Sequence, residues 1–131
     1  MQPAPRPTGP AAQRGVIQRQ ALDNIRALSA DRGDALVQKV IRAFTSHTPQ
    51  HLQTLRGAIA RHDGGTVRKI AHSLKSSSAN VGADALAQMC KDLEALGRAD
   101  SVDGAAPMLI EMEQEFQAVR QSLSALLEKE I

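Results

Sequence analysis

The sequence predicts an all-α protein: an antiparallel up-down four-helix bundle with one or two additional N-terminal helices. Hydrophobic residues make up 42% of its 131 residues, but Phe44 and Phe116 are the only aromatic ones. A core of aliphatic residues favours helices over a β-sandwich or barrel. Apolar residues recur at spacings of three and four, and no segment alternates as a half-buried strand does. The connections are short, which makes consecutive helices antiparallel neighbours.

The N-terminal residues 1–15 are predicted to form a disordered or linker-like segment, because four of the six prolines lie within the first ten residues. Residues 16–131 are predicted to form one helical domain, as expected for a chain of this length. The proline-rich head is typical of an interdomain linker, and therefore of a domain within a longer protein.

Amphipathic stripes, each a predicted helix, follow one another along the rest of the chain. The Thr48-Pro49 pair predicts an N-cap followed by proline in a first helical turn, and so a break between the second and third stripes. Gly82 is predicted to close the fourth stripe in the left-handed conformation. We expect the last four helices to form the core and the first two to pack as a lid or extension. The stripes run from Ile17 to Leu28, Leu36 to Phe44, Leu52 to Ile59, Val67 to Val81, Leu86 to Leu96, and Leu109 to Leu126.

Composition argues against several classes of protein. A single cysteine, Cys90, excludes a disulfide framework, and it lies on an apolar stripe, as a core residue does. His47 and His51 are spaced like zinc ligands, but Pro49 lies between them and no Glu follows His47 as in a His-Glu-x-x-His motif, so no metal site is predicted. A net charge of +2 is too small to indicate nucleic-acid binding. There is no signal peptide and no apolar stretch of membrane-spanning length, so we expect a cytoplasmic protein without direct membrane insertion.

His72 is predicted to face solvent in the middle of a helix over residues 66–80. The apolar residues of this helix turn one side to the core, and His72 lies on the opposite side together with Arg68, Lys75, Ser76 and Ala79. A lone exposed histidine usually belongs to an ordinary solvated surface. Here the two small residues leave room for another protein to approach. Neutral imidazole is a nucleophile, and the cation of Lys75 would stabilise a phosphoryl group attached to it.

Glu94 is the predicted partner of His72. With the turn at Gly82, His72 is level with about Asp92 on the returning helix, and Glu94 lies only roughly 3 Å of helical rise beyond. Its carboxylate could accept a hydrogen bond from one ring nitrogen and leave the other nitrogen free to attack. The alternative interpretation of Glu94 is an ordinary surface carboxylate.

The predicted helical hairpin carries a recognisable pattern: AHSLKSSSANVGA over 71–83, then Leu86, Cys90, Leu93-Glu94 and Gly97-Arg98. These residues resemble the histidine-containing phosphotransfer (HPt) domain of multistep two-component phosphorelays, including the C-terminal domain of some hybrid sensor histidine kinases. The family motif is roughly A-H-x-L-K-G-S followed by a Gly-Ala pair. The resemblance covers both helices of the hairpin and is weaker from Leu22 onward to the C-terminus.

The resemblance implies that His72 is phosphorylated on a ring nitrogen and that Lys75 supports the phosphoryl group. Arg98 matches a position that is basic in some members, but it lies roughly 9 Å past His72 along the helix axis, so only an extended side chain would reach. Ser76 stands where the family usually has glycine. The added hydroxymethyl group leaves the phosphorylation prediction in place and affects partner choice and transfer rate.

By resemblance, the chain is a phosphocarrier that accepts a phosphoryl group from one receiver-domain aspartate and passes it to another. It lacks a Gly-rich nucleotide loop, so we expect no kinase activity, no ATP site and no cofactor, with Mg²⁺ bound by the partner receiver. The expected form is a monomer that binds no nucleic acid. The alternative function is a non-catalytic helical protein–protein interaction module. The predicted partner-binding residues are Arg68, Lys69, Ser73, Ser76 and Ala79.

Overall fold

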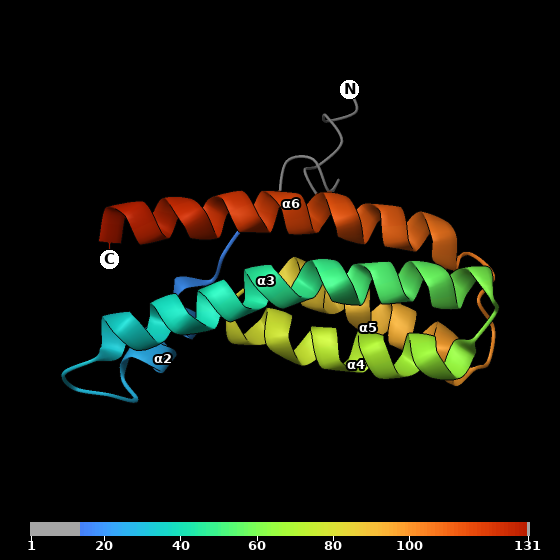
Figure 1. Ribbon diagram of the computed structural model, residues 1–131, viewed down its shortest axis with the longest axis horizontal. Helices are drawn as coiled ribbons and strands as arrows, with labels where there is room; N and C mark the ends of the chain where they lie inside the picture. Colours follow the sequence, from blue (N-terminus) through green and yellow to red (C-terminus); the bar gives the residue numbers. More distant parts are fainter. Residues whose placement is uncertain (1–13, 131) are drawn as a thin grey trace, which may run out of the picture.

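The computed structural model describes residues 14–130, and the side chains of residues 14–129. The first thirteen residues of the predicted linker-like segment therefore lie outside the described part of the chain. All regular structure in residues 14–130 is helical, which confirms the predicted all-α class. The four long helices lie side by side along the length of the molecule, and the short α2 packs near the start of α3 (Figure 1). The helices are α2 (Arg19–Arg26), α3 (Gly33–Ala60), α4 (Gly64–Asn80), α5 (Asp84–Arg98) and α6 (Ala105–Glu130).

The apolar stripes of the long helices meet in one core. Phe44 of α3 and Phe116 of α6 pack edge to face, with ring centroids 5.8 Å apart, a favourable arrangement for two aromatic rings. The predicted stripe of the last helix is buried from Leu109 to Leu123 at its core-facing positions. None of the helices in residues 14–130 is both long and apolar enough to cross a membrane.

The predicted helix break at Thr48-Pro49 is wrong, because α3 continues through Pro49. Thr48 is buried, and its hydroxyl donates a hydrogen bond to the Phe44 carbonyl at 2.6 Å. Pro49 is exposed, so the proline ring, which has no backbone N–H, lies at the surface of α3 rather than in the core. Buried residues continue on both sides, including Ile41 and Leu52. Packing along the whole length of α3 therefore outweighs the local preference of proline for a first turn.

The first two predicted helices were expected to pack as a lid or extension. The second apolar stripe, Leu36 to Phe44, instead belongs to the core helix α3, so only α2 packs as an extension. Leu28 was expected on the first apolar stripe, but it lies beyond the end of α2 and is 78% exposed. Leu22, in contrast, is buried, and Ile25 packs against the core.

Residues 14–18, at the N-terminal end of the described chain, are held against the bundle by hydrogen bonds and one ion pair. The Gly15 N–H donates to Oε2 of the buried Glu115 on α6 at 2.9 Å, and Arg14 pairs with Glu111 at 3.2 Å. The Gln18 N–H then donates to the Gly82 carbonyl at 2.9 Å. Gly82 has φ +81°, the left-handed conformation predicted for it.

Two glycines, Gly64 of α4 and Gly97 of α5, let these helices approach each other closely. A Cβ atom on Gly97 would lie 2.7 Å from the Arg68 nitrogen and 2.8 Å from the Gly64 oxygen, both backbone atoms of α4. Gly97 is buried, and α5 continues through it to Arg98. This pair of helices makes the most extensive contact in the bundle, and it carries the site described next.

Candidate functional site

The position of His72 follows from the way α4 is anchored. Asp63 caps the helix: its carboxylate accepts hydrogen bonds from the Thr66 N–H at 3.1 Å and from the Thr66 hydroxyl at 2.7 Å. Ala71 and Leu74 are fully buried, which fixes the rotation of the helix about its axis. His72 is thereby turned outward, and its side chain is 61% exposed.

Glu94 of α5 lies beneath His72 and joins three side chains. Its Oε2 is 2.8 Å from His72 Nδ1 and accepts a hydrogen bond from Arg98 Nη2 at 3.1 Å. Its Oε1 accepts a hydrogen bond from Lys75 Nζ at 2.7 Å. The Glu94 side chain is only 5% exposed, so it is not the ordinary surface carboxylate of the alternative interpretation. The contact predicted from the hairpin spacing is present.

The electrostatics of this cluster favour an ionised Glu94. The hydrogen bond from Lys75 lowers the pKa of the Glu94 carboxyl below its usual value, and the hydrogen bond from His72 acts in the same direction, whereas burial opposes them. An ionised carboxylate can only accept, so His72 Nδ1 is the donor in the pair. The described residues form no hydrogen bond with His72 Nε2, the second ring nitrogen.

Apart from Arg98, which ends α5, the remaining predicted site residues lie on the exposed surface of α4 around His72. Ser76 makes one long hydrogen bond, to the His72 carbonyl at 3.5 Å. Arg98 reaches the cluster through Glu94, four residues earlier on the same helix, with its side chain largely exposed. The five predicted partner-binding residues are all exposed on α4: Arg68, Lys69, Ser73, Ser76 and Ala79.

Other nucleophilic and metal-binding groups are poorly placed for chemistry. Cys90 is fully buried, and burial raises the pKa of its thiol to about 12, so it is an inert core residue. Residues 14–129 bring together no group of three histidine, cysteine or acidic side chains that could hold a metal ion.

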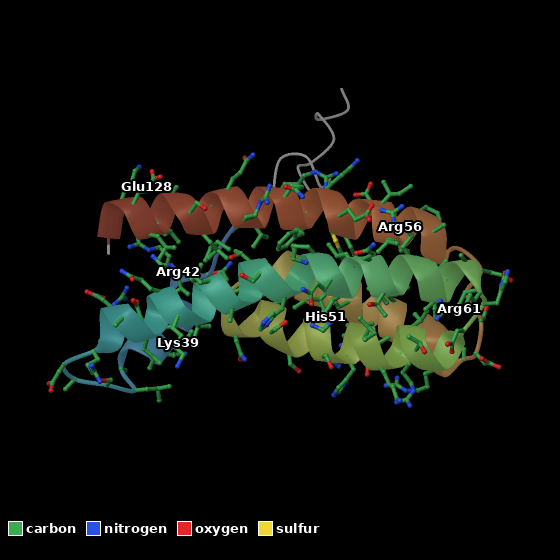
Figure 2. The ribbon with its side chains drawn as sticks, in the orientation of Figure 1. Lys39, Arg42, His51, Arg56, Arg61 and Glu128 are labelled. Atoms are coloured by element: carbon green, nitrogen blue, oxygen red, sulfur yellow. The ribbon has the colours of Figure 1, made fainter. Side chains whose placement is uncertain are left out.

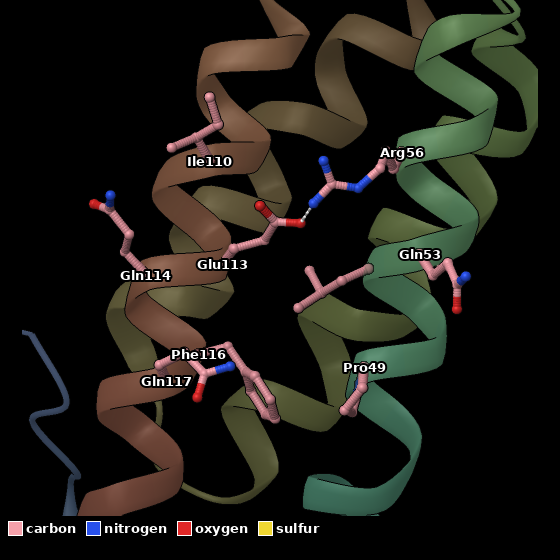
Figure 3. Close-up of a pocket in the computed structure, with 9 residues that line it drawn as sticks. Pro49, Gln53, Arg56, Ile110, Glu113, Gln114, Phe116 and Gln117 are labelled. Atoms are coloured by element: carbon pink, nitrogen blue, oxygen red, sulfur yellow. Dashed lines mark hydrogen bonds and ion pairs between the residues drawn. The ribbon is translucent and has the colours of Figure 1, made fainter.

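Sequence reasoning missed the hollows on either side of α3. A pocket of about 260 Å³ lies between α3 and α4 and includes Ser73, which follows His72. A second groove, of about 640 Å³, lies between α3 and α6, where Arg56 and Glu113 pair across it (Figure 3). None of the predicted site residues lines this second groove. His47 and His51 line the first pocket, but in the sequence their spacing was considered only as a metal-ligand pattern.

Comparisons with known proteins agree with this arrangement. The family model described as Hpt domain matches residues 39–122, well over half of the chain. The crystal structure of histidine-containing phosphotransfer protein B (HptB) from Pseudomonas aeruginosa PAO1 is similar, with a TM-score of 0.77 and 26% sequence identity. The match covers 88% of this chain and 96% of that one. A comparison with curated proteins gives no match. The chain therefore belongs to the Hpt domain family and is a phosphocarrier of two-component phosphorelays.

Proposed function

We propose that His72 is the residue that carries the phosphoryl group, and that Nε2 is the attacking atom. The observation that carries the proposal is the pairing of an exposed imidazole with a buried, ionised carboxylate at its Nδ1. A proton held on Nδ1 leaves the lone pair of Nε2 directed away from Glu94 and toward solvent.

In the proposed transfer, Nε2 attacks the phosphorus of a receiver aspartyl phosphate. The new N–P bond forms as the bond between phosphorus and the aspartyl oxygen breaks, and the aspartate leaves as its carboxylate. The Nδ1 proton stays between the ring and Glu94, whose charge stabilises the positive charge that develops on the imidazole. Attack by a second receiver aspartate on the phosphohistidine reverses these changes.

The proposed role of Lys75 and Arg98 is to stabilise the phosphoryl oxygens. Both cations now contact Glu94, which is also the hydrogen-bond partner of His72. Both also retain exposed side-chain surface, so each can turn toward an incoming anion. Arg68, Lys69, Ser73, Ser76 and Ala79 would contact the partner.

Mg²⁺ and the acidic site that binds it are proposed to come from the receiver domain. Both oxygens of Glu94 already face cations or a ring N–H, which makes it a poor ligand for a further cation. The domain itself would have no ATP site and would act as a monomer in the cytoplasm. Figure 1 supports an antiparallel four-helix bundle as the scaffold, because consecutive long helices run in opposite directions.

The test is transfer of labelled phosphate from phosphorylated receiver domains to this chain. We expect label that is labile in acid and stable in alkali, and we expect its complete loss in His72→Gln. His62→Gln is the matched control, because His62 is also exposed but lies at the turn before α4. Label that persists in His72→Gln, or none on the wild type with several receivers, would overturn the proposal.

A further inference from the structure

The groove of about 640 Å³ between α3 and α6 has an apolar lining. Phe116 points from α6 into the groove toward Pro49 of α3 (Figure 3), and the buried Leu52 also lines it. Ile110 lines the groove with 52% of its surface exposed, one of three large hydrophobic residues left exposed within residues 14–129. Exposed apolar surface that borders a groove is typical of a binding site.

The chain that precedes Arg14 leaves the bundle close to this groove. The Gly15 N–H binds Glu115 of α6, and Arg14 pairs with Glu111, one turn nearer the start of that helix. These contacts bring the chain to the level of Ile110, the residue next to Glu111. In Figure 3 the blue N-terminal ribbon lies on the opposite side of α6 from the groove. A segment that reaches the groove must therefore cross α6.

Residues 1–13 are long enough to cross α6 and lie along the groove. A helix with its side chains is about 10–12 Å across. The groove follows α6 from Ile110 to Gln117, which is about 10 Å of helical rise. Thirteen residues in the polyproline II conformation span about 40 Å. The length of the segment thus exceeds the path that it has to cover.

The composition of residues 1–13 matches the chemistry of the groove. The four prolines of this segment favour polyproline II, in which the backbone carbonyls have no internal hydrogen bonds. Amide N–H groups can donate to such carbonyls. The groove offers three exposed amide side chains: Gln53, Gln114 and Gln117. Grooves that combine an aromatic residue with hydrogen-bond donors are typical binding sites for proline-rich segments.

Charge favours the same occupant. Residues 1–13 contain Arg6 and no acidic residue. The part of α6 along the groove, Ile110 to Gln117, contains three glutamates and no lysine or arginine. Arg56, which extends from α3 toward α6 in Figure 2, pairs with one of these glutamates, and Arg14 pairs with another. A net negative charge remains, and it attracts a basic segment.

We propose that residues 1–13 bind in the α3–α6 groove as a polyproline II segment, with their prolines packed on Ile110 and Pro49. Their carbonyls accept hydrogen bonds from the glutamine side chains of the groove. None of the predicted site residues lines this groove, so the inference does not depend on the role of His72. The bound segment covers the exposed isoleucine and leaves the His72 surface free.

Paramagnetic broadening from a nitroxide at position 4 of the full chain tests the proposal. Ala4→Cys provides a selective attachment site, because Cys90 is fully buried and burial raises the pKa of its thiol to about 12. We expect the ¹⁵N-detected backbone amide signals of Gln53, Gln114 and Gln117 to broaden more strongly than those on the opposite side of α6. Reduction of the nitroxide should restore them.

Ile110→Gln, made in the spin-labelled chain, should weaken this broadening at least about twofold, because it removes apolar surface that the segment covers. Leu28→Gln is the matched control. Leu28 is also an exposed large hydrophobic residue, but it lies between α2 and α3, so the broadening should not change.

Broadening confined to the opposite side of α6, or spread evenly over the molecule, would overturn the proposal. The same holds for groove broadening that Ile110→Gln leaves at its full strength. Mixing spin-labelled chains with ¹⁵N-labelled chains that carry no nitroxide tests for a second copy. Groove broadening in that mixture would show that the occupant comes from another molecule, and would also overturn the proposal.

Discussion

Glu94 Oε2 lies 2.8 Å from His72 Nδ1, so a carboxylate that is 5% exposed supports an imidazole that is 61% exposed. The pair comes from two helices of one hairpin, and the close approach of α4 and α5 at Gly97 holds them together. The buried partner orients the ring, while the exposed nitrogen remains accessible to another protein. The same carboxylate gathers the two cations nearest to the ring.

Glu94→Gln should slow receiver-to-His72 transfer by about tenfold or more, in the range typical of lost supporting hydrogen bonds. Glutamine has the same shape but no charge to hold the proton on Nδ1 or to balance a positive ring. The ¹⁵N chemical shifts of the His72 ring should show a more even mixture of the two neutral tautomers. Asp92→Asn is the control, since Asp92 is exposed on α5 and accepts a hydrogen bond from Gln88, away from His72. Unchanged ¹⁵N shifts in Glu94→Gln would show that Glu94 does not set the tautomer.

Lys75→Ala should shorten the lifetime of phosphohistidine and slow transfer, because it removes a cation from the phosphoryl group. The measurement is the decay of labelled phosphate on the isolated domain, together with the transfer rate. Lys91→Ala, an exposed lysine of α5, should leave both rates as they are. Decay and transfer rates in Lys75→Ala equal to those of the wild type would exclude Lys75 from the mechanism. Its hydrogen bond to Glu94 would then be a structural contact.

Gly97→Ala should destabilise the domain by about 1–3 kcal/mol, as overpacking of a close helix contact does. The new methyl group would meet backbone atoms of α4, which cannot move aside as the end of a side chain can. Gly57→Ala is the matched control within α3. Its Cβ would meet only the Arg61 guanidinium, at 3.1 Å, so we expect it to be neutral or to stabilise the helix by up to about 1 kcal/mol. Urea unfolding measures both. Equal stability of the two variants would contradict a tight α4–α5 contact at Gly97.

Glu115→Gln should remove one pH-dependent contribution to the free energy of unfolding. Burial raises the pKa of Glu115, although the Gly15 N–H and Arg14 oppose the rise. Because the folded-state pKa lies above the unfolded one, its contribution is most favourable below the usual value of 4.5 and is lost as pH rises through the folded value. Glutamine can still accept the Gly15 N–H, so the variant should gain stability relative to the wild type as pH rises from acid to neutral.

Glu94 contributes with the opposite sign, since its pKa is lowered: its stabilisation is present above the usual pKa and is lost on acidification. The Glu115→Gln comparison therefore uses the difference between variant and wild type at each pH, in which the contribution of Glu94 cancels. Glu128→Gln, a change of an exposed glutamate of α6, should give a difference that does not vary with pH. A Glu115→Gln difference that is equally flat would show that Glu115 is not destabilised by its burial.

The sequence was most informative where the controlling contacts are local. The level of Glu94 opposite His72 follows from counting residues around one tight turn, and the rotation of α4 follows from its apolar stripe. Arg98 was placed at the limit of its reach, and it meets His72 only through their shared partner, Glu94. A prediction based on pairs of residues does not find such a bridge.

Contacts between distant residues could not be predicted in this way. Glu115 is at the edge of the α6 stripe and resembles a surface residue until Gly15, one hundred residues earlier, covers it. Pro49 was misassigned because the local rule for proline carries no information on the packing of α3 against the rest of the core. In both cases the deciding term is tertiary packing, which local patterns do not contain.

Ser76→Gly should separate helix stability from access to His72, because it restores the residue usual in this family. Ser76 is exposed one turn after His72, and its hydroxyl makes only a long contact with the His72 carbonyl. The change should cost roughly 0.5 kcal/mol of stability, the difference in helix propensity between the two residues. It should also raise the transfer rate, because glycine lets the receiver backbone approach more closely. Ser124→Gly, at an exposed position of α6, should show a similar loss of stability with no gain in rate. If Ser76→Gly transfers more slowly than the wild type and Ser124→Gly does not, then the Ser76 hydroxyl assists the phosphoryl group rather than crowding the partner.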